Sequence, residues 1–419
     1  MKIKIDHIAK IEGHAGFTAD IVGGDITQAR LSVLEGARLL EGILRGRKYY
    51  EVSPITARIC GVCPVVHTLT SLKALENAFE TEVSSQTILL RKLLMLGQMI
   101  NSHALHIFFF SLSDFFGIEN DLDLIKKYPE KTKAAVAIRD FGNKIIEIIG
   151  GRSIHPITPE VGGFTKLPDT RQIKEIGEMA KKILPSAVKL ANFFAKLNYP
   201  EFERQTDFIS LSSPNEYAIY EQEITINGLS KEPNVESFMH RIKEFQVSED
   251  AVKRTEIDNK PYMVGAITRI NNNHEKLNLK ADKILRSSGI KLPSYNPFYN
   301  ILAQAIEIVH CVEEAIMLAK GKKINRTESN PAKIRQGRGS AAIEAPRGTL
   351  FYFYEARSDG LIENCNIITP TAQNLARLEE DLAIWLPQLE KQGVGEEEIK
   401  NKIRMLIRAY DPCLTCATH

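Results

Sequence analysis

The sequence predicts an α+β fold, with a predominantly helical core bundle and peripheral β-hairpins. Its first 35 residues alternate between apolar and polar side chains, which is the period of a β-strand. Further along, apolar residues recur at helical spacing, and the stretch from about Ser85 to Phe116 is apolar on most sides. A helix of that kind is expected inside a protein rather than on its surface. Two strand-like runs near residues 350 and 365 complete the mixed pattern.

The composition is that of an ordinary globular protein large enough to bury its own core. The chain has 419 residues, of which 43% are hydrophobic and 25% charged. A formal net charge of +2 gives no argument for a nucleic-acid partner, and no basic face with interleaved aromatic residues is present. The N-terminus lacks the apolar region of a signal peptide, and no stretch has 18 uncharged apolar residues, so we expect no membrane span.

The N-terminal region, about residues 1–35, is predicted to form strands joined by a tight hairpin. The strands contain Ile3 and Ile5, then Ala15–Val22, then Ala29–Leu34, and Gly23-Gly24-Asp25 has the composition of the turn. From Gly36 to Arg47 a helical period takes over, with Glu41 among its apolar residues. On residue type alone, Glu41 is expected to be a solvated carboxylate.

The middle of the chain is predicted to be mainly helical. Within the apolar helix from Ser85 to Phe116, His103 and His106 share a face and could bind metal, although buried histidines satisfied by backbone groups or by each other are more common. The other predicted helices are Thr68–Glu80, Lys131–Ile149 and Asp169–Lys196.

The C-terminal half is predicted to contain short strands and three further helices. Residues 200–260 are polar and mixed, and only short strands are expected there. Pro297 is expected at the first position of a helix that ends at Gly321, and Lys320 to Arg338 is expected to be a solvated loop. Paired strands are predicted at Leu350–Tyr354 and Cys365–Ile368, followed by helices at Thr371–Trp385 and Glu396–Tyr410. With no repeat and no low-complexity linker, we expect residues 1–419 to form a single domain.

Two Cys-x-x-Cys pairs lie at opposite ends of the sequence. Cys60 and Cys63 are followed by His67, whereas Cys413 and Cys416 are followed by His419, the last residue. A chain terminus usually frays, so an end rich in potential metal ligands is expected to be held in place. If the pairs share one site, the two ends of the chain meet at a buried metal site.

Three explanations fit the cysteines alone. A structural zinc site is one, but its Cys pairs are typically separated by about 15–20 residues. Two unrelated pairs of buried cysteines are another. The third is a catalytic metal site rich in thiolates, which need positive charge to stay ionised and select zinc, copper(I), iron–sulfur clusters or soft divalent iron and nickel.

The motifs around these cysteines resemble the large subunit of nickel–iron hydrogenases. That family's first signature, Arg-x-Cys-Gly-x-Cys-x-x-x-His, is met by Arg58 to His67, and its last, Asp-Pro-Cys-x-x-Cys-x-x-His, by Asp411 to His419. Further landmarks of the family lie between them. They are Ile11-Glu12-Gly13-His14, Glu41 before Ile43-Leu44-Arg45-Gly46-Arg47, Ser102-His103, His155 with Gly162-Gly163-Phe164, Ala345-Pro346-Arg347-Gly348 and Ile368-Thr369-Pro370-Thr371. The chain is short for the family, which favours its soluble cytoplasmic branch.

The resemblance implies a specific set of metal ligands. Cys60, Cys63, Cys413 and Cys416 would bind nickel, and Cys63 and Cys416 would also bridge to an iron that carries carbonyl and cyanide ligands. A magnesium ion would be held by the Glu41 carboxylate, the Ile367 carbonyl and the His419 imidazole.

The resemblance also implies roles for residues around the metals. Arg347, held by Pro346, would lie over the anionic site together with Asp411. Thr371 would donate to a cyanide nitrogen and His67 to a bridging sulfur. Cys413 would accept the proton of split H2 and pass it to Glu12. Ser102, where some members have aspartate, is assigned no catalytic role.

The implied function is reversible heterolytic cleavage of H2 to protons and electrons, with the electrons passed to an iron–sulfur small subunit. Diaphorase, flavin or other electron-transfer subunits are expected beyond it. A maturation peptidase of the family cleaves directly after the final histidine, so an end at His419 is expected of a matured chain. Two rival functions remain, namely a quinone-reducing respiratory-complex subunit, which typically lacks these cysteines, and a non-enzymatic structural zinc protein.

Overall fold

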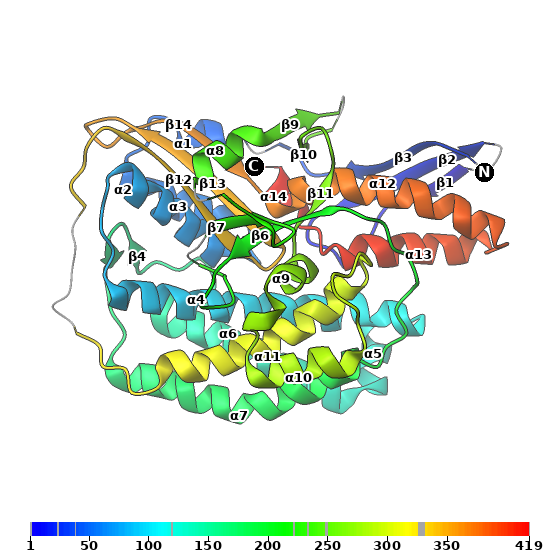
Figure 1. Cartoon of the computed structure of the whole chain (residues 1–419), viewed down its shortest axis with the longest axis horizontal. Coiled ribbons are helices and arrows are strands. Elements are labelled where there is room, and N and C mark those ends of the chain that lie inside the picture. Colours follow the sequence, from blue (N-terminus) through cyan, green and yellow to red (C-terminus); the bar gives the residue numbers. More distant parts are fainter. Residues whose placement is uncertain are drawn as a thin grey trace.

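The computed structural model describes residues 2–22, 25–37, 39–118, 120–220, 223–232, 234–247, 250–325 and 332–418 (Figure 1). The α-helices are α1 Leu40–Leu44, α2 Tyr49–Thr56, α3 Pro64–Ala78, α4 Ser85–Ala104, α5 Asp121–Lys127, α6 Pro129–Gly150, α7 Thr170–Phe194, α8 Val235–Arg241, α9 Ala266–Asn273, α10 Leu279–Ser288, α11 Tyr299–Ala319, α12 Pro370–Lys391, α13 Glu396–Ala409 and α14 Leu414–Ala417. The strands are β1 Lys2–Ile5, β2 Ala15–Val22, β3 Asp25–Val33, β4 Pro159–Glu160, β5 Gly163–Phe164, β6 Asp207–Ser212, β7 Glu223–Ile226, β8 Ser230–Glu232, β9 Ile242–Gln246, β10 Lys253–Ile257, β11 Tyr262–Met263, β12 Gly337–Ala345, β13 Gly348–Ala356 and β14 Ile362–Ile368.

Four long helices, α4, α6, α7 and α11, pack against one another and form the helical half of the molecule (Figure 1). Their ends follow local sequence signals: Ser84 caps α4 by accepting the Thr87 N–H, Pro129 starts α6, and Asp169 with Gln172 forms a capping box at α7. The predicted helix from Ser85 to Phe116 is confirmed. Its last part changes geometry, with a π-helix over Leu105–Ser111 and a 3-10 helix over Leu112–Phe116.

The second layer is built around the antiparallel sheet β12-β13-β14, which packs on α3. The α+β class is therefore confirmed, but this sheet differs from a peripheral hairpin, because nearly every residue of β13 is buried. A tight connection joins β12 to β13, with Ala345 paired to Gly348. Pro346 and Arg347 thus lie at the tip of a turn inside the protein.

The N-terminal strands also form as predicted. β1, β2 and β3 make an antiparallel sheet, and α12 packs against β3. Of the expected turn residues, Gly23 and Gly24 lie outside the described residues, whereas Asp25 is the first residue of β3 and not part of the turn.

Several predicted boundaries were wrong for local reasons. The helix expected over Gly36–Arg47 is confined to Leu40–Leu44, and Gly46 just beyond it has φ 76°, a left-handed conformation that ends a helix. The helix expected to start at Pro297 starts at Tyr299, because Asn296 folds the preceding residues into a turn by accepting the Phe298 N–H. Gly337 and Arg338, expected in the loop from Lys320, already belong to β12.

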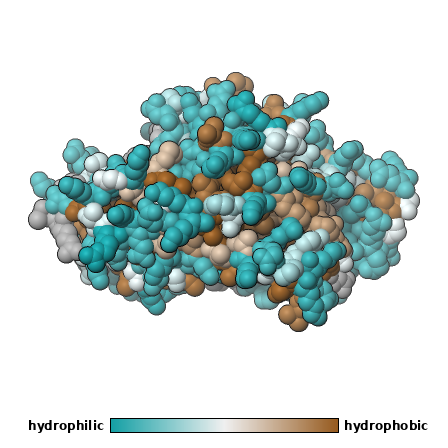
Figure 2. Space-filling view, turned by 90° about the horizontal axis from the view of Figure 1, so that it is seen from below, coloured by the Kyte–Doolittle hydropathy of each residue, from teal (hydrophilic) through white to brown (hydrophobic). Residues whose placement is uncertain are grey.

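One helix in the described part of the chain, the segment Ser85–Phe116, has the length and apolarity of a membrane span. However, 83% of its most apolar window is buried inside the protein, as in the core helix of many globular folds. The underside of the molecule is mostly hydrophilic, with hydrophobic side chains gathered in separate patches near its centre (Figure 2).

The two ends of the chain meet beside the sheet β12-β13-β14. Glu12 and Cys413 form an isolated parallel bridge, and the Leu414 N–H donates to the Glu12 carbonyl oxygen at 2.9 Å. Gly13, with φ 88°, lets the two segments approach, because a Cβ there would lie 2.9 Å from Leu414 Cβ. The expectation that the end of the chain is held in place is confirmed up to Thr418.

Candidate metal centre

Four cysteine sulfurs from the two ends of the chain lie together. The Sγ atoms of Cys60, Cys63, Cys413 and Cys416 are all within 4.8 Å of one another, and all four residues are buried. Cys60 Sγ is 3.4 Å from Cys413 Sγ, and Cys63 Sγ is 3.5 Å from Cys416 Sγ. Each cysteine of the first pair therefore faces one cysteine of the second pair, as expected of one shared site.

Helix starts hold both pairs in place. Cys63 is the N-cap residue of α3, whose first position is Pro64, and Cys413 is the N-cap residue of α14. The backbone N–H groups of Val62 and Cys63 point at Cys60 Sγ, each at 3.3 Å. Amides directed at a sulfur favour its thiolate form.

The chemistry of the four sulfurs fits a soft metal. Burial raises the pKa of Cys416 well above its ordinary value, and the hydrogen bond with Cys413 raises the pKa of Cys63. Four thiolates cannot share this buried volume without positive charge, and a divalent metal supplies that charge while it displaces the protons.

Glu12 contacts the outer side of this cluster. Cys413 Sγ is 3.1 Å from Glu12 Oε2, and the Thr415 hydroxyl donates to the same oxygen at 2.5 Å. Burial and the neighbouring Cys413 raise the pKa of Glu12 to about 7. A carboxyl group with that pKa can both accept and release a proton near neutral pH.

Arg347 and Asp411 form a buried ion pair above the cysteines. Arg347 Nη2 is 3.0 Å from Asp411 Oδ1, and Arg347 Nε donates to the Asp411 carbonyl oxygen at 2.8 Å. Burial alone would lower the pKa of Arg347, but Asp411 and the cysteines raise it further than burial lowers it. Its Nη1 group is buried and has no partner among the described residues. A buried guanidinium with a free donor beside four thiols fits an anionic group in this site.

His67 and Thr371 contact the cysteines from two other sides. His67 Nε2 is 3.5 Å from Cys416 Sγ, and its Nδ1 is 2.7 Å from the Tyr352 hydroxyl. The Thr371 hydroxyl accepts the Cys413 N–H at 2.9 Å, which leaves its own proton free to donate. A small cavity lies among these groups. It is lined by Cys63, His67, Ala345, Pro346, Arg347, Leu350, Pro370, Thr371, Cys413 and Cys416.

Of the three predicted magnesium ligands, the structure describes only Glu41 and Ile367. Glu41 Oε1 accepts the Ile367 N–H at 2.9 Å, so these two residues are neighbours as expected. The Glu41 side chain is 21% exposed, and Lys253 Nζ lies 3.4 Å from its Oε2. His419 lies outside the described residues. A divalent cation at Glu41 would have to compete with the Lys253 ammonium.

The paired histidines on α4 and the following π-helix are buried and hydrogen-bonded, although His103 Nδ1 has no partner among the described residues. His103 Nε2 is 2.8 Å from Glu307 Oε2, and His106 Nε2 is 2.7 Å from the Arg408 carbonyl oxygen. The interpretation that they are buried is confirmed, and His106 contacts backbone as expected, but the partner of His103 is a carboxylate rather than backbone or the other histidine. Ser102, next to them, is fully buried and its hydroxyl has no partner in the described part of the chain.

Three contacts of the site were missed from the sequence. Thr415 lies inside the last motif, so its position alone could have signalled its contact with Glu12. Tyr352 is one aromatic residue in a strand of several, and Lys253 is 212 residues from Glu41. Nothing in their local pattern marks either of them.

Comparisons with known proteins agree with this geometry. A family model described as nickel-dependent hydrogenase matches residues 38–138 and 251–419. Sulfhydrogenase 1 subunit alpha of Pyrococcus furiosus is 35% identical, over 100% of this chain and 98% of that protein. The NAD-reducing hydrogenase HoxS subunit beta of Cupriavidus necator is 25% identical, over 100% of this chain and 94% of that protein.

Solved structures give the same result. A structure of an NAD+-reducing [NiFe]-hydrogenase in its H2-reduced state matches with a TM-score of 0.93 and 26% identity, covering 100% of this chain and 99% of that one. The Ni-Fe-Se hydrogenase of D. vulgaris Hildenborough, at 23% identity and a TM-score of 0.78, shares the fold.

The relatives are named as subunits of larger hydrogenases, and the rival quinone-reductase and zinc-protein functions find no support among them. The chain belongs to the nickel-dependent hydrogenases, as the catalytic large subunit of an oxidoreductase that acts on H2.

Proposed function

We propose that Cys60, Cys63, Cys413 and Cys416 hold a nickel–iron pair and that the protein cleaves H2 reversibly into two protons and two electrons. The observation that carries this proposal is the cluster of four buried sulfurs within 4.8 Å, contacted by a carboxyl group on one side and a guanidinium on another. When bound, the metals supply the acceptor for the hydride equivalent of H2.

The proton leaves through Cys413 and Glu12. Their 3.1 Å contact is short enough for direct transfer between Sγ and Oε2, and the Thr415 hydroxyl fixes the carboxylate in this orientation. The pKa of Glu12, about 7, allows it to pass the proton in either direction, which a reversible reaction needs.

Iron in this site would carry carbonyl and cyanide ligands in the cavity beside Cys63 and Cys416. Three residues that line that cavity could donate: Arg347 through its unpartnered Nη1, Thr371 through its hydroxyl and His67 through Nε2. Arg347 and Thr371 would hold the anionic cyanides, and His67 would donate to the sulfur of Cys416. The apolar side chains of Ala345, Pro346 and Leu350 keep bulk water from this side.

A magnesium ion would bind at Glu41, the Ile367 carbonyl and His419. The contact between Glu41 and Ile367 supports this proposal, because it places the Glu41 carboxylate against the strand β14. When magnesium binds, the Lys253 ammonium would turn toward Glu244, 3.3 Å away, which it already contacts.

The electrons pass to an iron–sulfur small subunit. Cys311 and Cys365, the two remaining cysteines, are buried outside the four-sulfur cluster, so this chain offers no second thiolate cluster for an electron relay. Further diaphorase, flavin or electron-transfer subunits would follow, and a maturation peptidase would act at the C-terminus.

The face beside Cys60 suits this small subunit. Arg58 and Gly61 are exposed just before and within the first cysteine motif, and His155 Nδ1 bonds the Ala57 carbonyl oxygen at 2.9 Å. Exposed apolar side chains lie on the neighbouring segments, including Tyr50 at 63% and Ile157 at 60%. A partner that covers them lies next to the metal centre.

We also propose a cytoplasmic location and a single domain over residues 1–419. Six cysteines, none of which forms a disulfide, suit a reducing compartment. One hydrophobic cluster includes residues from both ends of the chain, such as Ile3 and Leu414, which supports one folding unit.

The function is tested by H2-dependent reduction of an artificial electron acceptor by the purified, matured complex. The expected result is turnover that is lost in Cys413→Ser, while the neighbouring Thr415→Val variant keeps its nickel. A complex that contains nickel but neither oxidises nor evolves H2 would overturn the proposal.

A further inference from the structure

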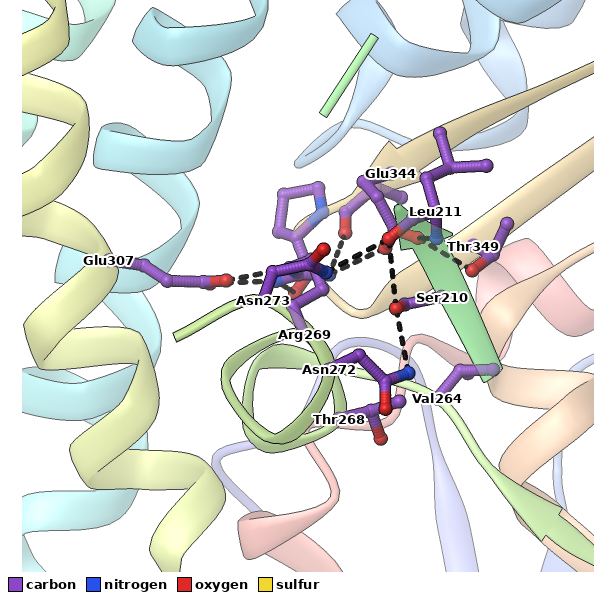
Figure 3. Close-up of polar contacts among 12 residues, drawn as sticks. Ser210, Leu211, Val264, Thr268, Arg269, Asn272, Asn273, Glu307, Glu344 and Thr349 are labelled. Atoms are coloured by element: carbon purple, nitrogen blue, oxygen red, sulfur yellow. Dashed lines mark hydrogen bonds and ion pairs between the residues drawn. The ribbon is translucent and has the colours of Figure 1, made fainter. Parts of the chain in front are cut away.

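Arg269 on α9 has no solvent exposure, and its guanidinium uses all five of its N–H donors. Nε and Nη2 form a bidentate pair with the Glu307 carboxylate at 2.6 and 2.7 Å, and Nη1 donates to Glu344 Oε2 at 3.0 Å. The remaining two donors bind backbone: the Ala345 carbonyl oxygen at 2.9 Å and the Pro346 carbonyl oxygen at 3.0 Å. Figure 3 shows Arg269 between Glu307 on the helix α11 and Glu344 near the end of β12.

The acceptors of Arg269 are themselves held by several elements. Glu307 also accepts from the Tyr217 hydroxyl at 2.6 Å and contacts His103 on α4. Glu344 Oε1 accepts the Leu211 N–H and the Thr349 hydroxyl, both at 2.7 Å (Figure 3). The guanidinium therefore connects the helical half of the molecule to the sheet β12-β13-β14.

Such a cluster is a poor device for stability alone. All three charged groups are fully buried, and the attraction inside a buried ion pair often only offsets the cost of removing the charges from water. Two carboxylates face one guanidinium, and burial raises the pKa of Glu344 despite the charge of Arg269. What the cluster does provide is a fixed orientation of the groups that bind Arg269, because five donors in a rigid plane bind five acceptors at fixed positions.

The two backbone acceptors lie in the turn that carries Arg347. The carbonyl groups of Ala345 and Pro346 belong to the two peptide units directly before Arg347, so their orientation sets the direction in which Arg347 leaves the turn. The other side of the turn is also closely packed, because a Cβ on Gly348 would lie 2.4 Å from Val264 Cγ2, just before α9. The turn is thus held between Val264 and Arg269.

We propose that Arg269 is a positioning residue for the reaction at the metal centre. By binding the two turn carbonyls, it holds Arg347 in register with Asp411 and with the cavity beside the cysteines. The expected effect on the reaction rate rests on the proposed function, but the expected effect on the position of Arg347 rests on the structure alone.

The test is the Arg269→Lys variant of the matured complex. Lysine keeps the charge but has a single nitrogen, so it cannot bind two carboxylates and two carbonyls in one plane. We expect kcat for H2 oxidation to fall about 10²-fold at unchanged nickel content, since a displacement of about 1 Å at a catalytic group has effects of this size. In a crystal structure of the variant, the 3.0 Å contact between Arg347 Nη2 and Asp411 should be lost.

Arg91→Lys is the matched control. Arg91 is equally buried and forms a bidentate pair with Glu76, at 2.5 and 2.7 Å, but it contacts no residue of the β12–β13 turn. We expect this variant to lose as much thermal stability as Arg269→Lys while kcat stays at its wild-type value. If Arg269→Lys does not fold, Glu307→Gln takes its place, because it weakens the anchor of Arg269 and keeps the shape of the side chain.

The proposal is overturned if the variant keeps its kcat and the position of Arg347, or if Arg91→Lys loses kcat to the same extent. Failure of the proposed function would look different. The wild-type complex would then contain nickel and not turn over H2, and displacement of Arg347 in the variant crystal would still support the positioning role.

Discussion

Replacement of Glu12 by glutamine tests the proposed proton route most closely. Glutamine has the shape of glutamate, its Oε1 can still accept from Thr415, and the backbone carbonyl of residue 12 can still accept the Leu414 N–H at 2.9 Å. The free energy of unfolding should therefore change by less than about 1 kcal/mol, which is the net worth of one ordinary hydrogen bond. What is lost is the group with a pKa of about 7 that faces Cys413 Sγ.

The size of the kinetic effect follows from the role of that group. Loss of a positioned acid or base typically costs 10²–10⁴-fold in rate, which corresponds to about 3–5 kcal/mol of activation free energy. We therefore expect exchange between D2 and water protons to fall by about 10²–10⁴-fold in Glu12→Gln, with nickel content and melting temperature unchanged.

The assay is mass spectrometry of HD and H2 released under D2. Glu216→Gln is a suitable control, because Glu216 is a carboxylate that binds Lys92 at 2.8 Å and none of the four cysteines. Wild-type exchange in Glu12→Gln would refute the route through Glu12. Loss of nickel together with exchange would mean that Glu12 acts on the fold of the site instead.

Three further predictions concern Arg347 and Thr371 beside the cysteines, and the buried His310 elsewhere in the fold. Arg347→Lys should lower kcat by about 10²–10³-fold in H2 oxidation assays, because lysine cannot bind Asp411 and keep a second donor in the cavity; full activity would contradict its role. Thr371→Val should leave the Cys413 N–H unpaired, cost about 1–3 kcal/mol in thermal unfolding and shift the infrared bands of the iron ligands; an unshifted spectrum would exclude contact with them. Burial lowers the pKa of His310 from 6.5 to about 4, so the unfolded chain binds the extra proton and stability should rise by about 3 kcal/mol from pH 4 to 6.5. Denaturant titrations of wild type and His310→Gln measure that slope, and equal slopes would refute the assignment to His310.

The shared site of the four cysteines could be predicted from the sequence because each cysteine lies in a short motif of fixed spacing. The structure then confirmed that the two motifs meet, because their four sulfurs lie within 4.8 Å of one another. Helices with long apolar stripes, such as α4 and α11, were predictable for a similar reason, since each pattern is local.

The rest depends on contacts between distant parts of the chain. Arg269 looks like any polar residue in a short helix, and its partners Glu307 and Glu344 lie 38 and 75 residues away. Lys253 reaches Glu41 over a still larger separation. The prediction that a helix starts at Pro297 was wrong because of a local contact rather than a distant one. The Asn296 side chain forms a turn that competes with the first turn of the helix.

A nickel–iron pair held by both ends of the chain can be detected by metal analysis combined with infrared spectroscopy of the anaerobically purified complex. We predict one nickel and one active-site iron per large subunit, with carbonyl and cyanide bands, and the loss of nickel and of these bands in Cys60→Ser. Zinc alone, without nickel and without these bands, would contradict this prediction.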